Sequence, residues 1–167
     1  MKFTKVFVKI AEGFKNSRFI INQGGSSSSK SYSAIQLIII KALKSNEPKL
    51  FSIVSETIPH LKRGVMRDFF KIIIESGLYR EEHHNKTDST YQLGNWTIEF
   101  FSADNDAKLR GARRDFLFVN ECNRITWDAF TQLEIRTRDK IILDFNPVSR
   151  FWVHSKLMNP NNSYSFI

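Results

Sequence analysis

Short apolar runs alternate along the chain with longer segments whose apolar residues recur at helical spacing. Residues 18–22 (Arg-Phe-Ile-Ile-Asn) form a β-prone run, and residues 32–43 contain no glycine or proline and predict a buried helix. Residues 49–55 (Lys-Leu-Phe-Ser-Ile-Val-Ser) predict a second strand. A Gly/Ser-rich stretch separates the first strand from the first helix, so the order is strand, loop, helix, strand.

A capped helix and a hairpin follow. Thr57 can cap a helix that has Pro59 near its first turn and ends before Gly77. The apolar residues of this segment recur at helical spacing: Leu61, Val65, Phe69, Ile72 and Ile73. Residues 91–93 and 96–101, separated by Gly-Asn at 94–95, predict a β-hairpin.

The last third of the chain continues the alternation. Residues 115–120 (Asp-Phe-Leu-Phe-Val-Asn) are apolar with polar ends, which is typical of a central parallel strand. Residues 126–136 predict a helix, residues 140–145 another buried strand, and residues 164–167 the start of one more. Strands that alternate with helices predict an α/β domain: a mostly parallel central sheet flanked by helices, with a small β-hairpin insertion.

Polar residues follow several of these strands. They occupy residues 24–31, residues 55–56, residues 120–121 and Asn146. Ligands of open α/β sheets bind beyond the carboxyl ends of the strands. We therefore expect these residues to gather at one place.

Composition limits the class of protein. A chain of 167 residues with 41% hydrophobic and 25% charged residues suits one globular domain. The longest apolar run, residues 37–40, is far shorter than the ~20 residues of a membrane span. The N-terminus alternates Lys with Phe and Val, unlike the continuous apolar stretch of a signal peptide. The single cysteine, Cys122, fits a reducing compartment.

The charge balance points to partners rather than to a fold. The formal net charge is +8 and the pI is about 9.7. Polyanions, and nucleic acid first among them, are natural partners for such a surface. A surface that is merely rich in solubilising lysines is the alternative.

The loop between the first strand and the first helix matches a phosphate loop. It departs from the pattern G-x-x-x-x-G-K-[ST] only where serine replaces the second glycine. Its residues are Gly24, Gly25, Ser26, Ser27, Ser28, Ser29, Lys30 and Ser31. Small residues and a helix N-terminus let backbone N–H groups surround phosphate oxygens. The alternative is a serine-rich linker followed by a chance Lys-Ser.

Two residues of this loop have side chains suited to ATP and Mg²⁺. Lys30 would reach the β- and γ-phosphates, and the Ser31 hydroxyl would bind Mg²⁺. If the loop requires a positive φ at Ser29, serine is strained there and glycine would not be.

The strand at residues 116–121 resembles a second ATPase motif, with four apolar residues before Asn120 and Glu121. Glu121 would polarise the attacking water. Asn120 occupies the position of the usual aspartate and could accept a hydrogen bond from a water on Mg²⁺, but it brings no negative charge. A surface glutamate after a buried strand is the alternative, and Cys122 is expected to pack in the core.

Two further residues are candidates for the reaction. Asn146 could sense the γ-phosphate and couple hydrolysis to movement, or could belong to an Asn-Pro turn that merely ends a strand. Arg110 is our first choice for an arginine on the γ-phosphate, and it could act in a neighbouring subunit. Most of the competing arginines are expected to be solvated or to face DNA: Arg63, Arg67, Arg113, Arg114, Arg136 and Arg138. No His, Cys and carboxylate spacing completes a zinc site around the adjacent pair His83 and His84.

Three segments taken in order resemble one protein family. INQGGSSSSKSYS, LRGARRDFLFVNECN and LDFNP resemble the large terminase subunit of tailed bacteriophages, in the branch whose third motif reads Phe-Asn-Pro. The resemblance covers about residues 18–155. It implies an ASCE-type P-loop ATPase that drives double-stranded DNA into a procapsid, with Lys30 and Ser31 in the phosphate loop, Glu121 in catalysis and Asn146 in coupling.

The resemblance also implies partners and a location. The partners are a portal protein and a small terminase subunit, the assembly is a pentameric ring that could be a monomer in isolation, and the place is the cytoplasm of a bacterial host. Many relatives carry an arginine in the phosphate loop; serines replace it here, which shifts the expectation to Arg110.

Relatives also carry a C-terminal nuclease domain. We expect residues 1–167 to form a single ATPase domain without it, and an end within a predicted strand suggests truncation. The rival readings are a helicase-like translocase, a module that binds nucleotide or DNA without hydrolysis, and a purely structural domain.

Overall fold

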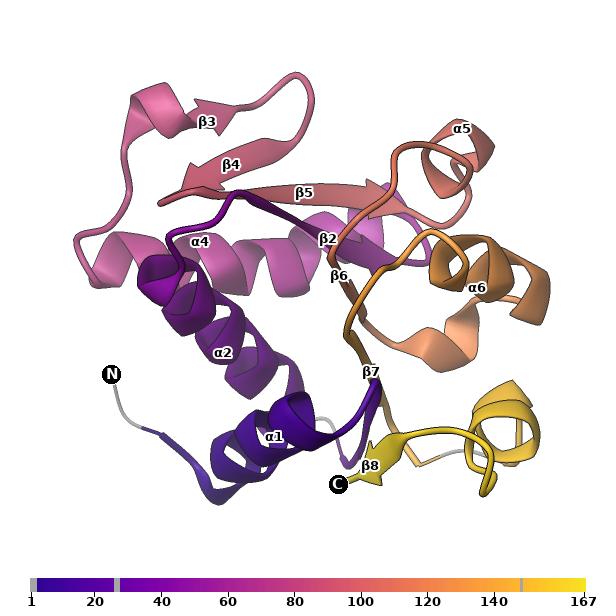
Figure 1. Ribbon diagram of the computed structural model, residues 1–167. Helices are drawn as coiled ribbons and strands as arrows, with labels where there is room; N and C mark the ends of the chain where they lie inside the picture. The colour runs from indigo at the N-terminus through magenta and orange to yellow at the C-terminus, as the bar shows by residue number, and fades with distance from the viewer. Residues whose placement is uncertain (1–2, 26–27, 148) are drawn as a thin grey trace.

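A computed structural model describes residues 3–25, 28–147 and 149–167 (Figure 1). Its centre is an eight-stranded sheet in the order β3-β4-β5-β2-β6-β7-β1-β8. The strands are β1 Phe19–Gln23, β2 Lys49–Ser55, β3 His84–Asn85, β4 Thr90–Leu93, β5 Trp96–Ser102, β6 Phe116–Val119, β7 Ile141–Phe145 and β8 Tyr164–Phe166. In this order, every pair of adjacent strands from β5 through β2, β6, β7 and β1 to β8 is parallel. The pairs β3–β4 and β4–β5 are antiparallel.

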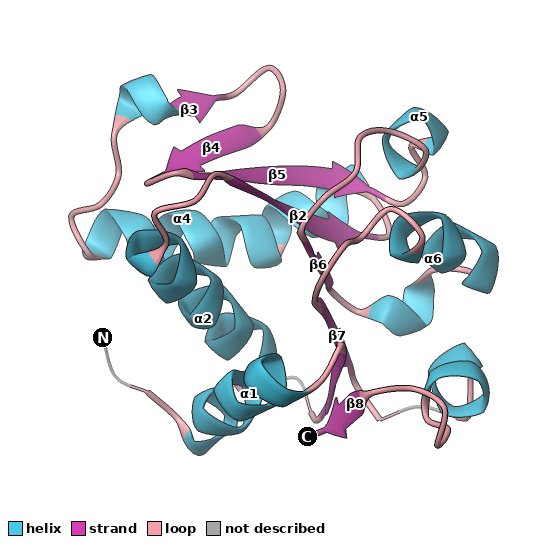
Figure 2. Cartoon of the chain, viewed as in Figure 1, coloured by secondary structure: helices cyan, strands magenta, loops and turns pink. Residues whose placement is uncertain are grey.

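Helices cover both faces of this sheet (Figure 2). They are α1 Lys5–Asn16, α2 Lys30–Lys44, α3 Ile58–Arg63, α4 Val65–Glu75, α5 Asp106–Leu109 and α6 Trp127–Glu134. A π-helix spans Val153–Leu157, and short 3₁₀ turns span Glu81–His83 and Cys122–Arg124. The predicted α/β class, with a mostly parallel sheet and an added hairpin, is confirmed.

The alternation of side chains along each strand creates two cores. Ile20 and Phe118 pack in one cluster with apolar residues of α1, α2 and α4. Their neighbours in the chain, Ile21 and Val119, pack in the other with α6 and the π-helix. The central strands are apolar on both faces for this reason, as parallel strands between helical layers must be.

Most predicted elements lie within one to two residues of their observed bounds, and β2 spans the predicted residues 49–55. The helix expected between Thr57 and Gly77 is an exception, because it is two helices. The chain leaves helical geometry at Gly64, where φ is −105° and ψ is −111°, so α3 ends and α4 begins at this residue. Thr57 does cap α3, accepting a hydrogen bond from the backbone N–H of His60 at 3.4 Å.

The N-terminal segment was not predicted as a helix. Its lysines alternate with apolar residues in the sequence, yet it forms α1, capped by Thr4, whose hydroxyl accepts from the N–H of Phe7 at 3.2 Å. Ile10 and Phe14 bury one face of α1 against the sheet and α2. None of the helices in the described ranges is both long and apolar enough to cross a membrane.

Candidate active site

The loop between β1 and α2 is shaped by close contacts between small residues. A Cβ at Gly24 would meet the Ser28 hydroxyl at 2.8 Å, so a larger residue there would displace the Ser28 side chain. Ser29 has φ 60° and ψ 17°, which confirms the expected left-handed residue directly before α2. Ser26 and Ser27 lie outside the described residues, so their expected place in the phosphate loop is untested.

Lys30 joins this loop to the end of β7. Its side chain is largely buried, and its ammonium donates hydrogen bonds to the carbonyl oxygens of Gly24 and Gly25, the latter at 3.0 Å. It also donates to the Ser28 hydroxyl at 3.2 Å and to Asn146 Oδ1 at 3.1 Å. The structure therefore brings Lys30 and Asn146, 116 residues apart, into direct contact.

A row of buried polar residues crosses the carboxyl ends of the parallel strands. Ser55 and Ser102 pair in register on β2 and β5, and Asn22 and Asp144 pair in register on β1 and β7. Asn120 follows β6 between these two pairs, and its Oδ1 accepts a hydrogen bond from the Ser55 hydroxyl at 3.3 Å. All five side chains are at most 6% exposed. The expected gathering of polar groups at the strand ends is confirmed.

Asp144 is the acidic member of this row. Ser31 donates a hydroxyl hydrogen bond to its Oδ2, and Asn120 Nδ2 donates to both carboxylate oxygens, at 3.1 and 3.3 Å. The backbone N–H of Glu121 donates to Oδ1 at 2.7 Å. Burial raises the pKa of this carboxyl above its ordinary value, and the bonds from Ser31 and Glu121 oppose that shift.

Asp144 was not among the residues predicted for the site, although a signal for it is visible in the sequence. It is the one charged residue within the apolar run of residues 141–145. A charge inside a fully buried strand needs hydrogen bonds or a cation, so such a residue is a candidate for a site.

Glu121 follows the row and has an unusual backbone. Its φ of 52° and ψ of 55° lie in the left-handed region, which is strained for a side chain of this kind. Its carboxylate accepts from Arg124 Nε at 2.6 Å and lies 3.3 Å from His60 Nε2. Neither partner was predicted from the sequence. Only the separation of three residues between Glu121 and Arg124 could have suggested that ion pair.

Two cavities flank Lys30. One, of about 90 Å³, is lined by Lys30, Ser31, Glu121, Asp144, Phe145 and Asn146. The other, of about 200 Å³, is lined by Lys5, Val6, Lys9, Asn22, Gln23, Ser28, Lys30 and Ile167. In the first cavity, carboxylate and hydroxyl oxygens lie beside the Lys30 ammonium. The second cavity is bordered by three lysines, which suit an anionic ligand.

The oxygens in the smaller cavity fit Mg²⁺. This ion takes oxygen ligands and is commonly held by one or two carboxylates together with phosphate oxygens and water. Ser31 and Asp144 supply a hydroxyl and a carboxylate in contact with each other. Among the described residues, no group of three or more His, Cys, Asp or Glu side chains forms a metal site by itself, so phosphate would have to complete this one.

Residues 16–165 match the family model for the phage terminase large subunit. The chain belongs to the phage terminase large subunit family. The fold agrees, since the large terminase of a thermophilic bacteriophage superposes on all of the chain with a TM-score of 0.85 at 15% identity. That match covers 45% of the thermophilic phage protein, so the present chain spans less than half the length of this relative.

Two further terminase structures share the fold. The same thermophilic phage terminase in complex with ATP-γ-S matches 99% of this chain and 44% of its own, with a TM-score of 0.82 at 15% identity. The large terminase ATPase domain of Thermus phage P74-26 matches 99% of this chain and 80% of its own, with a TM-score of 0.68 at 14% identity. No curated protein sequence matches the chain.

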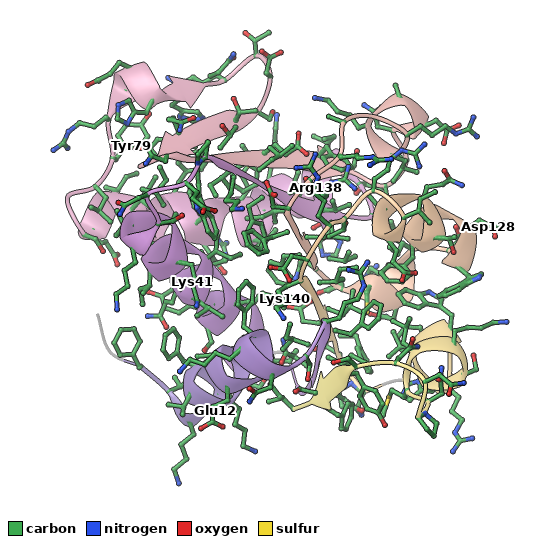
Figure 3. All side chains as sticks on the ribbon, viewed as in Figure 1. Glu12, Lys41, Tyr79, Asp128, Arg138 and Lys140 are labelled. Carbon is green, nitrogen blue, oxygen red and sulfur yellow. The ribbon has the colours of Figure 1, made fainter. Side chains whose placement is uncertain are left out.

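In this terminase chain Arg110 lies apart from the phosphate loop. It follows α5, is exposed, and lines a different cavity with Thr126 and Asp128. Figure 1 shows α5 far from the N-terminal end of α2, and Figure 3 shows Asp128 at the outer edge of α6. Arg110 and Lys30 thus line different cavities, and the role of Arg110 on a γ-phosphate stays a prediction.

Arg114 is not the solvated or DNA-facing residue that we expected. It is 1% exposed, and its guanidinium donates to the Ser52 hydroxyl at 2.8 Å and to the Leu133 carbonyl at 3.2 Å. It lies 4.0 Å from Glu99, which partly compensates its buried charge. Burial lowers the pKa of this guanidinium, and its contacts tie β2 to α6.

Cys122 is fully buried, as its expected packing role requires. Burial raises the pKa of its thiol well above the ordinary value. A protonated, inaccessible thiol is a poor nucleophile, so we assign Cys122 to the core.

Proposed function

We propose that this chain is the Mg²⁺-dependent ATPase motor domain of a DNA-packaging terminase, which hydrolyses ATP to move double-stranded DNA into a procapsid. The observation that carries this proposal is the cavity shared by Lys30, Ser31, Glu121, Asp144 and Asn146. It combines a phosphate-binding ammonium, oxygens for a divalent cation and a carboxylate that can act on water. Membership of the terminase family supports the reading as a packaging motor.

Each side chain has a distinct task in ATP hydrolysis. The ammonium of Lys30 would exchange its loop carbonyl partners for phosphate oxygens, which bind it more strongly because they are charged. Bound Mg²⁺ would neutralise charge on the β- and γ-phosphates. The Ser31 hydroxyl would contribute to holding the ion, and Glu121 would orient and polarise the attacking water.

Asn146 would couple the reaction to the rest of the sheet. Its amide oxygen accepts a hydrogen bond from Lys30, so a change in what Lys30 contacts alters the bonding of Asn146 at the end of β7. The residues after Asn146 lead to the π-helix and β8, which pairs with β1. This connection gives hydrolysis a route to movement of the chain.

The position of Arg110 supports a multi-subunit assembly. An exposed arginine that lines a different cavity from Lys30 can act on the nucleotide of the next subunit, as in a ring. We propose a pentameric ring on a portal protein, working with a small terminase subunit in the cytoplasm of a bacterial host. The net charge of +8 suits contact with DNA phosphates.

The test is steady-state phosphate release from ATP in the presence and absence of Mg²⁺, at protein concentrations that favour assembly. Lys30→Ala should abolish both nucleotide binding and turnover. Glu121→Gln should retain binding and lose at least ~10²-fold in turnover, which corresponds to about 2.7 kcal/mol of transition-state stabilisation.

Matched controls come from α4, on which Lys71 and Glu75 are exposed and form a surface pair at 4.0 Å. Lys71→Ala and Glu75→Gln make the same chemical changes away from the site and should leave turnover unchanged. If Glu121→Gln hydrolyses ATP as fast as the unmodified chain, the assignment of the catalytic glutamate is wrong. If the chain binds ATP tightly without hydrolysing it in any assembly state, a nucleotide-binding module replaces the motor.

A further inference from the structure

We infer that Asp144, at the end of β7, supplies the carboxylate of the Mg²⁺ site, and that Asn120, at the end of β6, is the positioning residue that holds it. This inference rests on the proposed ATPase function and names a residue that the sequence motifs do not. It reassigns the metal role that we expected of Asn120, and it leaves that of Ser31 in place.

The first observation is the position of Asp144 relative to the phosphate loop. Its Oδ2 accepts the hydroxyl hydrogen bond of Ser31, the residue expected to bind the ion. Asn120 Nδ2 reaches the same hydroxyl at 3.3 Å. The two strand-end residues therefore lie side by side around Ser31, and either position could present a carboxylate to the same ion.

The second observation is the orientation of the Asn120 amide. Its NH₂ group faces both oxygens of Asp144, and its Oδ1 faces the Ser55 hydroxyl. The reversed amide would place an acceptor oxygen against two carboxylate oxygens, which repel it. Asn120 thus directs hydrogen-bond donors toward the site. An ion, or a water bound to it, requires acceptors, and the carboxylate of Asp144 provides them.

The third observation is that the charge of Asp144 lacks a full counter-charge nearby. The side chain is 1% exposed, and its hydrogen bonds within the described ranges come from neutral groups of Ser31, Asn120 and Glu121. Lys30 lines the same cavity, and no ion pair joins the two side chains in the described part of the chain. An acidic side chain in such surroundings is a candidate ligand for a cation, because a buried carboxylate charge is strongly unfavourable unless it is paired or binds a metal ion.

The bond from the Glu121 backbone adds a consequence for catalysis. Asp144 accepts the N–H of the residue whose backbone is left-handed, so the carboxylate that holds the ion also fixes the strained turn that carries the catalytic glutamate. Metal site and water-activating group are therefore linked through one side chain.

The experiment measures ADP affinity by calorimetry, with saturating Mg²⁺ and with EDTA, in four forms of the full chain. These are the unmodified chain, Asp144→Asn, the exchange variant Asn120→Asp with Asp144→Asn, and the control Asp139→Asn. Asp139 has a half-exposed side chain, precedes β7 and is absent from both cavities. The Mg²⁺-dependent gain in ADP affinity is the readout, so turnover is not needed.

We expect Asp144→Asn to reduce this gain by about 10–100-fold while affinity in EDTA is preserved. The exchange variant moves the carboxylate to the end of β6 and should recover most of the gain, and Asp139→Asn should match the unmodified chain. Should Asp144→Asn fail to fold, the exchange variant decides the matter, because it keeps one carboxylate and one amide in the row.

Two results would overturn the inference. An undiminished gain in Asp144→Asn removes the metal role of Asp144. An exchange variant that folds, binds ADP in EDTA and shows no gain removes the claim that a carboxylate at either strand end can serve the same ion. Both leave the proposed function standing. If the unmodified chain itself binds no nucleotide, the proposed function fails instead, so the two failures are distinguishable.

Discussion

Two non-glycine residues beside the site have left-handed backbones. Ser29 has φ 60° and Glu121 has φ 52°, and one precedes the phosphate-binding helix while the other carries the catalytic candidate. Such conformations cost about 1–3 kcal/mol each and persist where surrounding structure enforces them. The position of Ser29 in the motif gave reason to consider a positive φ there, whereas the tertiary bond from the Glu121 backbone N–H to Asp144 lies outside any sequence motif.

Glycine at position 29 should relieve the strain at the start of α2. We expect Ser29→Gly to raise the free energy of unfolding by about 1 kcal/mol and the melting temperature by about 2–4 °C, because glycine adopts this conformation without steric conflict. Thermal unfolding followed by circular dichroism measures the effect.

The matched control is Ser89→Gly, since Ser89 has φ 54° in the turn before β4, away from the site. It should give a similar gain. If Ser89→Gly stabilises the protein and Ser29→Gly does not, Ser29 is not held in the left-handed conformation in solution.

At the scale of elements, the break at Gly64 changes what α4 can do. In a continuous helix, α3 and α4 would share one axis. Because they are two separate helices, α4 can lie along the sheet and cover β4 and β5. Phe69 of α4 is fully buried there, with its ring 5.8 Å from Tyr91 and 5.3 Å from Phe100. The pairing of β5 with β2 joins the antiparallel hairpin to the parallel sheet, and α4 packs on that hairpin.

Truncating Phe69 should therefore weaken this whole region. We expect Phe69→Ala to lower the free energy of unfolding by about 3–5 kcal/mol, because it leaves a cavity among aromatic rings. Ile74→Ala on the same helix should change it by less than about 0.5 kcal/mol, since Ile74 is 58% exposed. Urea unfolding of both variants is the measurement, and equal losses would contradict the packing described here.

At the scale of the whole molecule, the site joins segments that are distant in the sequence. Lys30 begins α2, Asn120 and Glu121 follow β6, and Asp144 and Asn146 stand at the end of β7. A ligand that contacts all of them stabilises the folded state of the entire domain, because these segments meet only when the sheet is formed.

Nucleotide binding should consequently raise the melting temperature of the whole chain in one transition. ATP-γ-S with Mg²⁺ at about 100 times its dissociation constant should add about 2.7 kcal/mol, or roughly 5–10 °C. Lys30→Ala should remove the shift, and Lys71→Ala should retain it. A shift that persists in Lys30→Ala would place the nucleotide elsewhere.

The sequence by itself predicted every described strand except β3, the helices α2 and α6, one helix where α3 and α4 lie, and the loop between β1 and α2. These depend on local patterns: alternation of apolar residues, caps, turns, and a Gly/Ser-rich loop between strand and helix. It could not reveal α1, whose apolar face becomes evident only where it packs against the sheet and α2. It also could not reveal the break at Gly64, because the apolar residues recur at the same helical spacing before and after that residue.

The members of the site divide in the same way. Lys30, Ser31, Glu121 and Asn146 could be named from motifs, because each motif is a continuous stretch of chain. The grouping of Asp144 with Asn120, the partners Arg124 and His60, the separation of Arg110 and the burial of Arg114 were decided by tertiary structure alone. Strand order and register place these residues together or apart, and both arise from packing between segments that the linear sequence does not connect.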